Sequence, residues 1–167
     1  MRKIGILTSG GDAPGMNAAI RAIVRSSLNK KFNVIGFKNG YDGLIDNKFV
    51  NFDRRSVGNI IQHGGSILYT SRSLRFLEEK YRLIAAKNLD KIDIDSLVVI
   101  GGEGSAMGAK ELAKTSKIKV VCIPATIDKD MPLVGKTIGF DTAINTALNA
   151  IDKIRDTATT SNVTHIV

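Results

Sequence analysis

Three short loops, two of them rich in glycine, carry residues that could bind phosphate or move a proton. The first, residues 10–15, reads Gly-Gly-Asp-Ala-Pro-Gly. Paired glycines let the backbone approach a ligand closely, and Pro14 suits the first turn of a helix whose amide groups face an anion. The pattern predicts an anion-binding turn, although a tight strand-to-helix turn without a ligand would look the same.

The second loop, residues 101–105, reads Gly-Gly-Glu-Gly-Ser and adds a carboxylate to the same kind of turn. A carboxylate beside a phosphate repels it unless a divalent metal ion bridges the two. Glu103 is therefore a candidate metal ligand. The alternative is an exposed loop residue near a helix dipole.

The third loop, residues 126–130, reads Thr-Ile-Asp-Lys-Asp. In an extended segment Asp128 and Asp130 would point to the same side, with Thr126 beside them. One carboxylate near a phosphoryl donor could accept the proton of an attacking hydroxyl, while its neighbour holds a metal ion or orients the substrate. An acidic loop that is merely solvated remains the alternative.

Several basic residues also have informative positions. Arg21 and Arg25 are one helical turn apart and share a face, which by itself is typical of a solvated surface. Arg72 lies in a loop and could bind a phosphate with two parallel hydrogen bonds.

Two common nucleotide-binding motifs are absent. Gly135-Lys136-Thr137 resembles the end of a P-loop, but Asp130 occupies the required upstream glycine position. Met107 stands where the dinucleotide fingerprint needs a glycine, which disfavours a Rossmann NAD site.

The elements around these loops alternate between apolar strands and amphipathic helices. We predict strands at residues 4–8, 32–37, 97–100, 119–123 and 164–167, and helices at residues 16–28, 77–85, 109–114 and 144–154. This order predicts an α/β fold, a three-layer Rossmann-like sheet that is mainly parallel with helices on both faces. Ligands of such sheets bind at the carboxyl ends of the strands, where the three loops lie.

Composition narrows the function classes. The formal charge of +8 suggests anionic partners or simply a soluble surface. The 5% aromatic content, the absence of Trp and the lack of a continuous basic block disfavour nucleic-acid binding. Cys122 lies in an apolar run and is expected in the core. With one cysteine and no long apolar N-terminal stretch, we expect a cytoplasmic protein without disulfides or a membrane span.

Five motifs in order make the chain similar to the bacterial 6-phosphofructokinase family. They are residues 4–17, 67–72, 101–105, 126–128 and 138–159. The resemblance covers the whole chain and implies that residues 1–167 form the N-terminal ATP-binding and catalytic-base domain. The C-terminal substrate half is then absent, and because the chain stops within an apolar segment, we expect a truncated form of a longer protein.

The resemblance implies transfer of the γ-phosphoryl group of ATP, with Mg²⁺, to the 1-hydroxyl of fructose 6-phosphate in glycolysis. Asp128 matches the general base, supported by Thr126 and Asp130, while Thr126, Ile127 and Asp128 would meet the sugar. Glu103 falls at the magnesium position. The residues that would contact ATP are Gly11, Arg72, Ser73, Gly102, Glu103, Gly104 and Ser105.

The resemblance also implies a regulated oligomer, a tetramer in the family. Arg21, Arg25, Arg54 and Arg155 match an effector site between subunits, where ADP or a similar phosphorylated regulator binds. Gly104 and Ala125 indicate ATP as the donor, because the resemblance implies Asp and Lys at these two positions in the relatives that use pyrophosphate.

Four positions depart from the family pattern. Glu103 replaces Asp and moves the carboxylate by about one bond length, and misplacement of about 1 Å can cost about a hundredfold in rate. Lys129 replaces Asn, and a cation there is expected to weaken Asp128 as a base. Val163 replaces an Arg that reaches the neighbouring subunit's sugar phosphate, and Asn59 replaces an effector-site acid. They suggest a partial or impaired enzyme, or alternatively a non-catalytic nucleotide-binding or regulatory remnant.

Overall fold

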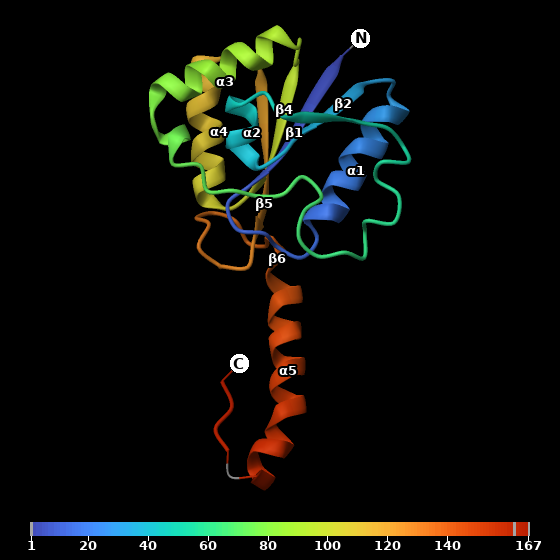
Figure 1. Cartoon of the computed structure of the whole chain (residues 1–167), viewed down its shortest axis with the longest axis vertical. Helices are drawn as coiled ribbons and strands as arrows, with labels where there is room; N and C mark the ends of the chain where they lie inside the picture. The colour runs from blue at the N-terminus through green and yellow to red at the C-terminus, as the bar shows by residue number, and fades with distance from the viewer. Residues whose placement is uncertain (1, 162, 167) are drawn as a thin grey trace.

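The computed structural model describes residues 2–161 and 163–166. Within these residues a six-stranded sheet has the order β3-β2-β1-β4-β5-β6 (Figure 1). All strands are parallel except β3, which pairs antiparallel with β2. The strands are β1 (Lys3–Ser9), β2 (Asn33–Phe37), β3 (Phe49–Phe52), β4 (Ser96–Gly101), β5 (Lys119–Thr126) and β6 (Ile138–Gly139).

Helices cover both faces of this sheet, as the sequence predicts (Figure 1). One face carries α1 (Met16–Asn29), and the other carries α2 (Gly40–Ile45), α3 (Glu79–Lys91) and α4 (Glu103–Thr115). A short 3-10 helix, η1 (Arg75–Leu77), precedes α3. The mainly parallel, three-layer α/β fold is confirmed.

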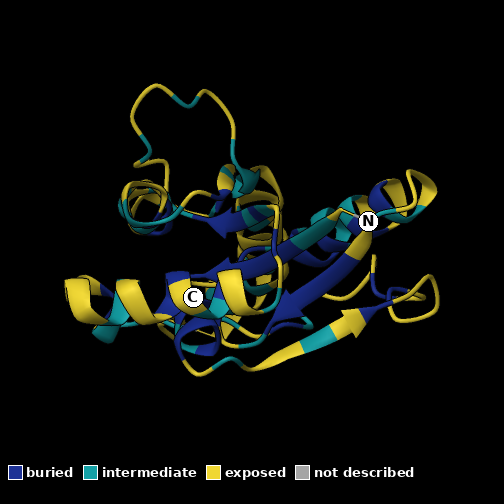
Figure 2. Ribbon diagram, turned by 90° about the horizontal axis from the view of Figure 1, so that it is seen from above, coloured by how far each residue is buried: buried dark blue, intermediate teal, exposed yellow. Residues whose placement is uncertain are grey.

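Alternation along the central strands builds two cores. Ile6 of β1 belongs to the apolar cluster that contains Met16 and Ile20 of α1. The next residue, Leu7, belongs to the cluster on the opposite face, which contains Leu89 and other apolar residues of α2, α3 and α4. Figure 2 shows the buried residues concentrated in the sheet and the exposed ones on the outer helix surfaces. Each such side chain, when fully buried, contributes roughly 1.5–3 kcal/mol, which explains why the central strands are apolar on both faces.

The strand order reverses beside β1 and creates the binding edge of the sheet. The chain passes from β1 outward to β2 and β3, then returns to place β4 on the other side of β1. Ser9 at the end of β1 pairs with Gly101 at the end of β4, which in turn pairs with Pro124 of β5. The first and second loops therefore emerge side by side at a topological switch point, where α/β sheets bind ligands.

Two expected boundaries differ from the structure. The sequence predicts Pro14 in the first helical turn, but α1 begins at Met16 and Gly15 is its N-cap, with φ of 99°. Pro14 thus lies in the turn before the helix. The helix expected at residues 109–114 begins already at Glu103, so Glu103 is helical rather than part of a loop.

The prediction that Cys122 is a core residue is wrong, because this cysteine is exposed. Its neighbour Val121 is 57% exposed. Strand β5 pairs with β4 along most of its length, but on its other side only Ala125 and Thr126 pair with β6. An apolar strand near the sheet edge therefore stays partly uncovered.

The long C-terminal helix is confirmed, but its apolar stripe is not buried. α5 (Phe140–Ser161) has no buried residue and extends away from the sheet (Figure 1). Ile144, Leu148 and Ile151 are 46%, 53% and 45% exposed. The strand expected at residues 164–167 is wrong for residues 164–166, which have no strand pairing, and Val167 lies outside the described residues.

Candidate functional site

A cavity of about 860 Å³ opens at the carboxyl ends of β1, β4 and β5. Its volume is that of a pocket for a nucleotide-sized ligand. All three loops contribute, together with the segment around Arg72. The lining residues used below are Gly11, Arg72, Ser73, Gly102, Gly104, Ser105, Thr126, Ile127, Asp128 and Asp130.

The structure therefore brings together nearly all the residues that the sequence suggested for nucleotide and sugar. Glu103 is the exception. It is the exposed first residue of α4 and does not line the cavity, although Gly102 and Gly104 on either side of it do.

Glycine is required in the first and second loops for two different reasons. Gly10 has φ of 85°, a left-handed conformation that favours glycine, and its amide donates to the carbonyl of Ser71 at 3.0 Å. At Gly101 a Cβ would collide with the carbonyl oxygen of Ser9, on the neighbouring strand. The close approach of β1 and β4 thus sets the two loops against each other.

Tyr41 of α2 supports the second loop through a hydrogen bond to Ser105. Its hydroxyl donates to the carbonyl oxygen of Ser105 at 2.6 Å, and its ring stacks on Phe76 with 4.0 Å between the ring centres. Burial is the main cause that raises the pKa of Tyr41, with a smaller contribution from Cys122. The hydroxyl therefore stays protonated and remains a donor.

The third loop bends rather than continuing the strand. The amide of Asp128 donates to Thr126 Oγ1 at 3.0 Å, and Thr137 Oγ1 donates to the Thr126 carbonyl at 2.9 Å. The extended conformation assumed for residues 126–130 is therefore not present, but Asp128 and Asp130 both line the large cavity.

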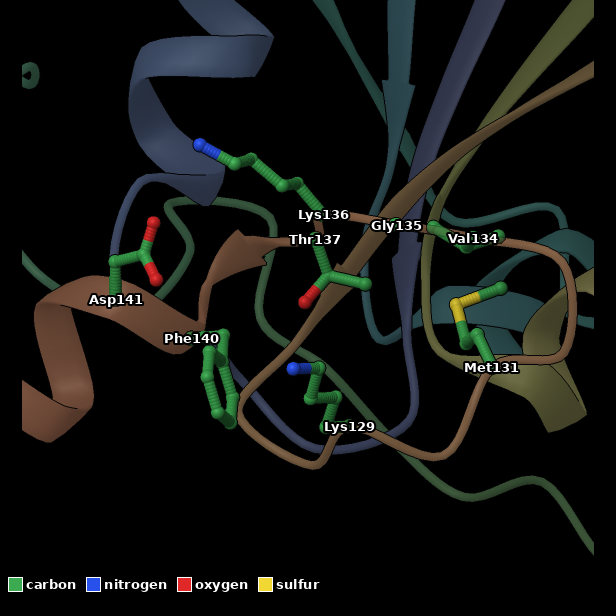
Figure 3. Close-up of a pocket in the computed structure, with 8 residues that line it drawn as sticks. All are labelled: Lys129, Met131, Val134, Gly135, Lys136, Thr137, Phe140 and Asp141. Carbon is green, nitrogen blue, oxygen red and sulfur yellow. The ribbon is translucent and has the colours of Figure 1, made fainter.

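Lys129 lies on another surface. It lines a separate hollow of about 120 Å³ with Lys136 and the start of α5 (Figure 3). Its ammonium is 5.7 Å from the centre of the Phe140 ring. The cation that replaces the family asparagine is thus not among the residues that line the large cavity.

The segment with Arg72 is held by a network that the sequence did not indicate. Asp42 of α2 accepts hydrogen bonds from Ser71, Ser73 and Arg75, and Arg75 also pairs with Asp46 at 2.9 Å. Partial burial acts to raise the pKa of Asp42, but the hydrogen bonds from Ser73, Arg75 and Ser71 outweigh it, so the pKa lies below its ordinary value. The partners are about 30 positions apart in sequence, and α2 is only six residues long, so no periodic pattern could have identified them.

An apolar side of the cavity was also missed. Leu74, Leu77 and Met107 line it and are 78%, 75% and 52% exposed. Exposed apolar side chains that gather in one cavity favour a flat, weakly polar group such as a nucleobase. The sequence indicates Leu77 only as the start of a predicted helix at residues 77–85.

The four arginines expected at an effector site lie outside the large cavity. Arg21 donates to the carbonyl of Val57, and Arg54 donates to Asn29 Oδ1 at 2.6 Å. Arg25 is exposed on α1, whereas Arg155 is exposed on α5, which extends away from the sheet.

The acidic residues of the cavity fit magnesium only together with a phosphate. Among the described residues, no group of three or more His, Cys, Asp or Glu side chains could hold a metal ion. Mg²⁺ usually takes one or two carboxylates plus phosphate oxygens and water, so a single carboxylate, Glu103 beside the cavity or Asp130 within it, is compatible with the ion. No helix in the described part of the chain has the length and apolar character needed to cross a membrane.

Comparison with protein families agrees with this geometry. The phosphofructokinase family model matches residues 3–167. The chain belongs to the phosphofructokinase family.

Two curated relatives show the level of similarity. The chain is 53% identical to the ATP-dependent 6-phosphofructokinase of Clostridium acetobutylicum and 52% identical to that of Bacillus pumilus, each over 167 residues. Both alignments cover 100% of this chain and 52% of the relative. The chain thus spans about half the length of these relatives.

Solved structures give the same fold. Phosphofructokinase from Saccharomyces cerevisiae superposes with a TM-score of 0.86 at 33% identity, over 95% of this chain and 24% of that one. A pyrophosphate-dependent phosphofructokinase from Marinobacter aquaeolei has a TM-score of 0.76 at 19% identity, over 96% and 44% of the two chains, which shows a shared fold alone.

Proposed function

We propose that this chain is the nucleotide-binding and base-carrying part of an ATP-dependent 6-phosphofructokinase. The reaction is transfer of the γ-phosphoryl group of ATP to the 1-hydroxyl of fructose 6-phosphate, giving fructose 1,6-bisphosphate. The observation that carries the proposal is the single cavity in which the first and second loops, Arg72 and Asp128 meet.

The roles follow from the chemistry of these groups. Amides of the glycine-containing loops and the start of α4 face the phosphates, where helix dipoles favour negative charge. Arg72 binds phosphate oxygens through its planar guanidinium. Asp128 accepts the proton of the 1-hydroxyl as its oxygen bonds to the γ-phosphorus and the bond to the β-phosphate oxygen breaks. Thr126 and Ile127 contact the sugar beside it.

Magnesium would be held by Glu103 together with phosphate oxygens, with Asp130 supporting the third loop. A Mg²⁺ ion held there would neutralise charge on the phosphates. Glu103 starts α4 next to the lining residues Gly102 and Gly104, so a rotation of its side chain toward the phosphates is what this role requires.

ATP is the donor that the cavity favours. The apolar side formed by Leu74, Leu77 and Met107 offers a surface for adenine, which pyrophosphate lacks. Gly104 leaves open space, since a Cβ there would meet no atom within 4 Å.

The remaining proposals concern the assembled protein. We place it in the cytoplasm as a homo-oligomer, with Arg21, Arg25, Arg54 and Arg155 binding a phosphorylated effector such as ADP between subunits. Arg25 and Arg155 are exposed on separate helices, which supports a site completed by a neighbouring subunit.

The test is Asp128→Asn in the protein at its full encoded length, assayed by coupled turnover of fructose 6-phosphate. Loss of the base lowers kcat by about 10²–10⁴-fold, with the KM for ATP unchanged. Lys129→Asn is the matched control: since Lys129 lies at the other hollow, its kcat stays within about threefold of the parent. An Asp128→Asn variant that retains more than a tenth of the parent kcat would contradict the proposal.

A second candidate is a non-catalytic nucleotide-binding domain, and the observation in its favour is that Glu103 lies outside the cavity lining. The two functions differ in the response to Glu103→Asp. In an enzyme, restoring the shorter family side chain changes kcat by about tenfold or more, since about 1 Å of misplacement has effects of this size. In a binding domain, parent and variant both bind ATP and neither turns over.

A further inference from the structure

Asp42 does not line the large cavity, yet it holds the segment that presents Arg72 to it. Asp42 Oδ2 accepts from Ser71 Oγ at 3.0 Å, and Oδ1 accepts from Ser73 Oγ at 2.7 Å. The guanidinium of Arg75 adds two more hydrogen bonds, from Nε at 3.0 Å and Nη2 at 2.8 Å. One carboxylate thus binds three of the five residues in the segment 71–75.

The two serines flank Arg72 in sequence. Anchoring the residue before and the residue after Arg72 fixes the backbone from which its side chain departs. Within the described residues, the guanidinium of Arg72 itself forms no hydrogen bond or ion pair with the protein, and Arg72 lines the cavity. Arg72 is therefore free to bind a ligand, and its placement depends on its neighbours.

Further bonds tie the same segment to the first loop. The Gly10 amide donates to the Ser71 carbonyl at 3.0 Å, and the Asn39 carbonyl lies 2.7 Å from Ser71 Oγ, so the single hydroxyl hydrogen of Ser71 is shared between Asn39 and Asp42. Because Ser71 bridges α2 and the first loop, its position sets Arg72 relative to the amides of Gly10 and Gly11.

Arg75, unlike Arg72, forms ion pairs with carboxylates of the protein. Both of its acidic partners, Asp42 and Asp46, lie on the α2 side, and its pairs with them are 2.8 and 2.9 Å long. Of two arginines three positions apart, one is neutralised by carboxylates and the other is left for the cavity.

We propose that Asp42 is a positioning residue for Arg72, which it holds ready for the phosphate groups of the nucleotide. The inference rests on the proposed function, since it takes the ligand of Arg72 to be ATP. Without Asp42, Ser73 loses its acceptor and Ser71 keeps only the Asn39 carbonyl, so the residue after Arg72 is no longer anchored. Arg75 still pairs with Asp46, although one negative charge is removed. Arg72 then loses its conformational freedom only when the nucleotide binds, and this loss of entropy lowers the affinity for ATP.

The experiment measures dissociation constants for Mg²⁺–ATP and for fructose 6-phosphate by calorimetry, in the protein at its full encoded length. Asp42→Ala is expected to weaken ATP binding about tenfold, a fraction of the loss that about 1 Å of misplacement can cause. Fructose 6-phosphate binding stays unchanged. Asp42→Asn recovers part of the loss, since its amide oxygen still accepts from one serine.

Asp46→Ala is the matched control. Asp46 shares Arg75 with Asp42 but accepts nothing from Ser71 or Ser73. Its ATP affinity therefore stays within about twofold of the parent, as for other surface substitutions. Equal losses of ATP affinity in Asp42→Ala and Asp46→Ala would overturn the inference, because the effect would then come from Arg75.

A double-mutant cycle asks whether Asp42 acts through Arg72. The account expects the Asp42→Ala/Arg72→Ala double variant to bind ATP no more weakly than Arg72→Ala alone. If the losses of ATP affinity in the two single variants multiply in the double variant, Asp42 does not act through Arg72 and the inference is overturned. The same holds if Asp42→Ala weakens the binding of ATP and of fructose 6-phosphate equally, because that would show a general structural role. If Asp42→Ala does not fold, the same cycle with Asp42→Asn decides. If Arg72→Ala binds ATP like the parent, the proposed function fails, and the inference with it.

Discussion

Lys129 stands between two carboxylates in the sequence, but its ammonium lies against the Phe140 ring while Asp128 and Asp130 line the large cavity. The bend at residues 127–129 produces this division. A substitution that would weaken the base in an extended loop is thereby moved to another surface. Glu103 remains the more consequential departure, since it lies between two lining residues.

The ion-pair network of Arg75 predicts a pH dependence of stability. Hydrogen bonds and charge from Arg75 lower the pKa of Asp46, and the pKa of Asp42 is also lowered, from the ordinary value of 3.8 in both cases. The unfolded chain then binds more protons than the folded one in acid, so this stabilisation is complete above the ordinary pKa. It is lost as the pH falls through the lowered values.

Urea unfolding between about pH 2 and pH 7 measures this effect, a window set by the ordinary carboxylate pKa. The free energy of unfolding should fall more steeply below about pH 4 in the parent than in an Asp42→Asn/Asp46→Asn double variant. Identical acid slopes in the two proteins would show that the network does not form in solution.

At the scale of elements, the short helix α2 supports two loops at once. Tyr41 bonds to the second loop through Ser105, and the adjacent Asp42 holds the segment with Arg72. A six-residue helix has too few turns for apolar periodicity, so nothing in residues 40–45 distinguishes it from a turn. Its function appears only when contacts from distant segments are known.

Tyr41→Phe tests this support. Removing the hydroxyl deletes its hydrogen bond to the Ser105 carbonyl, and the free energy of unfolding should fall by about 0.5–1.5 kcal/mol. The control is Tyr69→Phe, since Tyr69 is 60% exposed, and it should change stability by less than about 0.5 kcal/mol. Denaturant unfolding of both variants gives the comparison, and equal effects would contradict the supporting role of Tyr41.

The elements themselves were largely predictable, whereas their burial was not. The runs at residues 4–8 and 97–100 are apolar on both faces, which is typical of central parallel strands, and both are strands in the structure. The run around Cys122 looks the same in sequence, but β5 has a partner over only part of its outer edge. Burial depends on neighbouring elements, which a local pattern does not contain.

At the scale of the whole molecule, the large cavity lies at one edge of the sheet with its two helical layers, while α5 extends from the sheet with an uncovered apolar stripe. The loops could be predicted to converge because parallel strands end at one edge of the sheet. The network of Asp42 and the apolar side formed by Leu74, Leu77 and Met107 could not, since they join segments far apart in sequence.

Hydrogen exchange with and without Mg²⁺–ATP tests most directly whether one cavity binds the nucleotide. The account predicts slower exchange in residues 9–12, 72–77 and 102–108, the segments that line the cavity from three sides. Arg72→Ala should weaken this protection at a fixed ATP concentration. Unchanged exchange in all three segments at saturating ATP, or protection confined to other parts of the chain, would contradict the account.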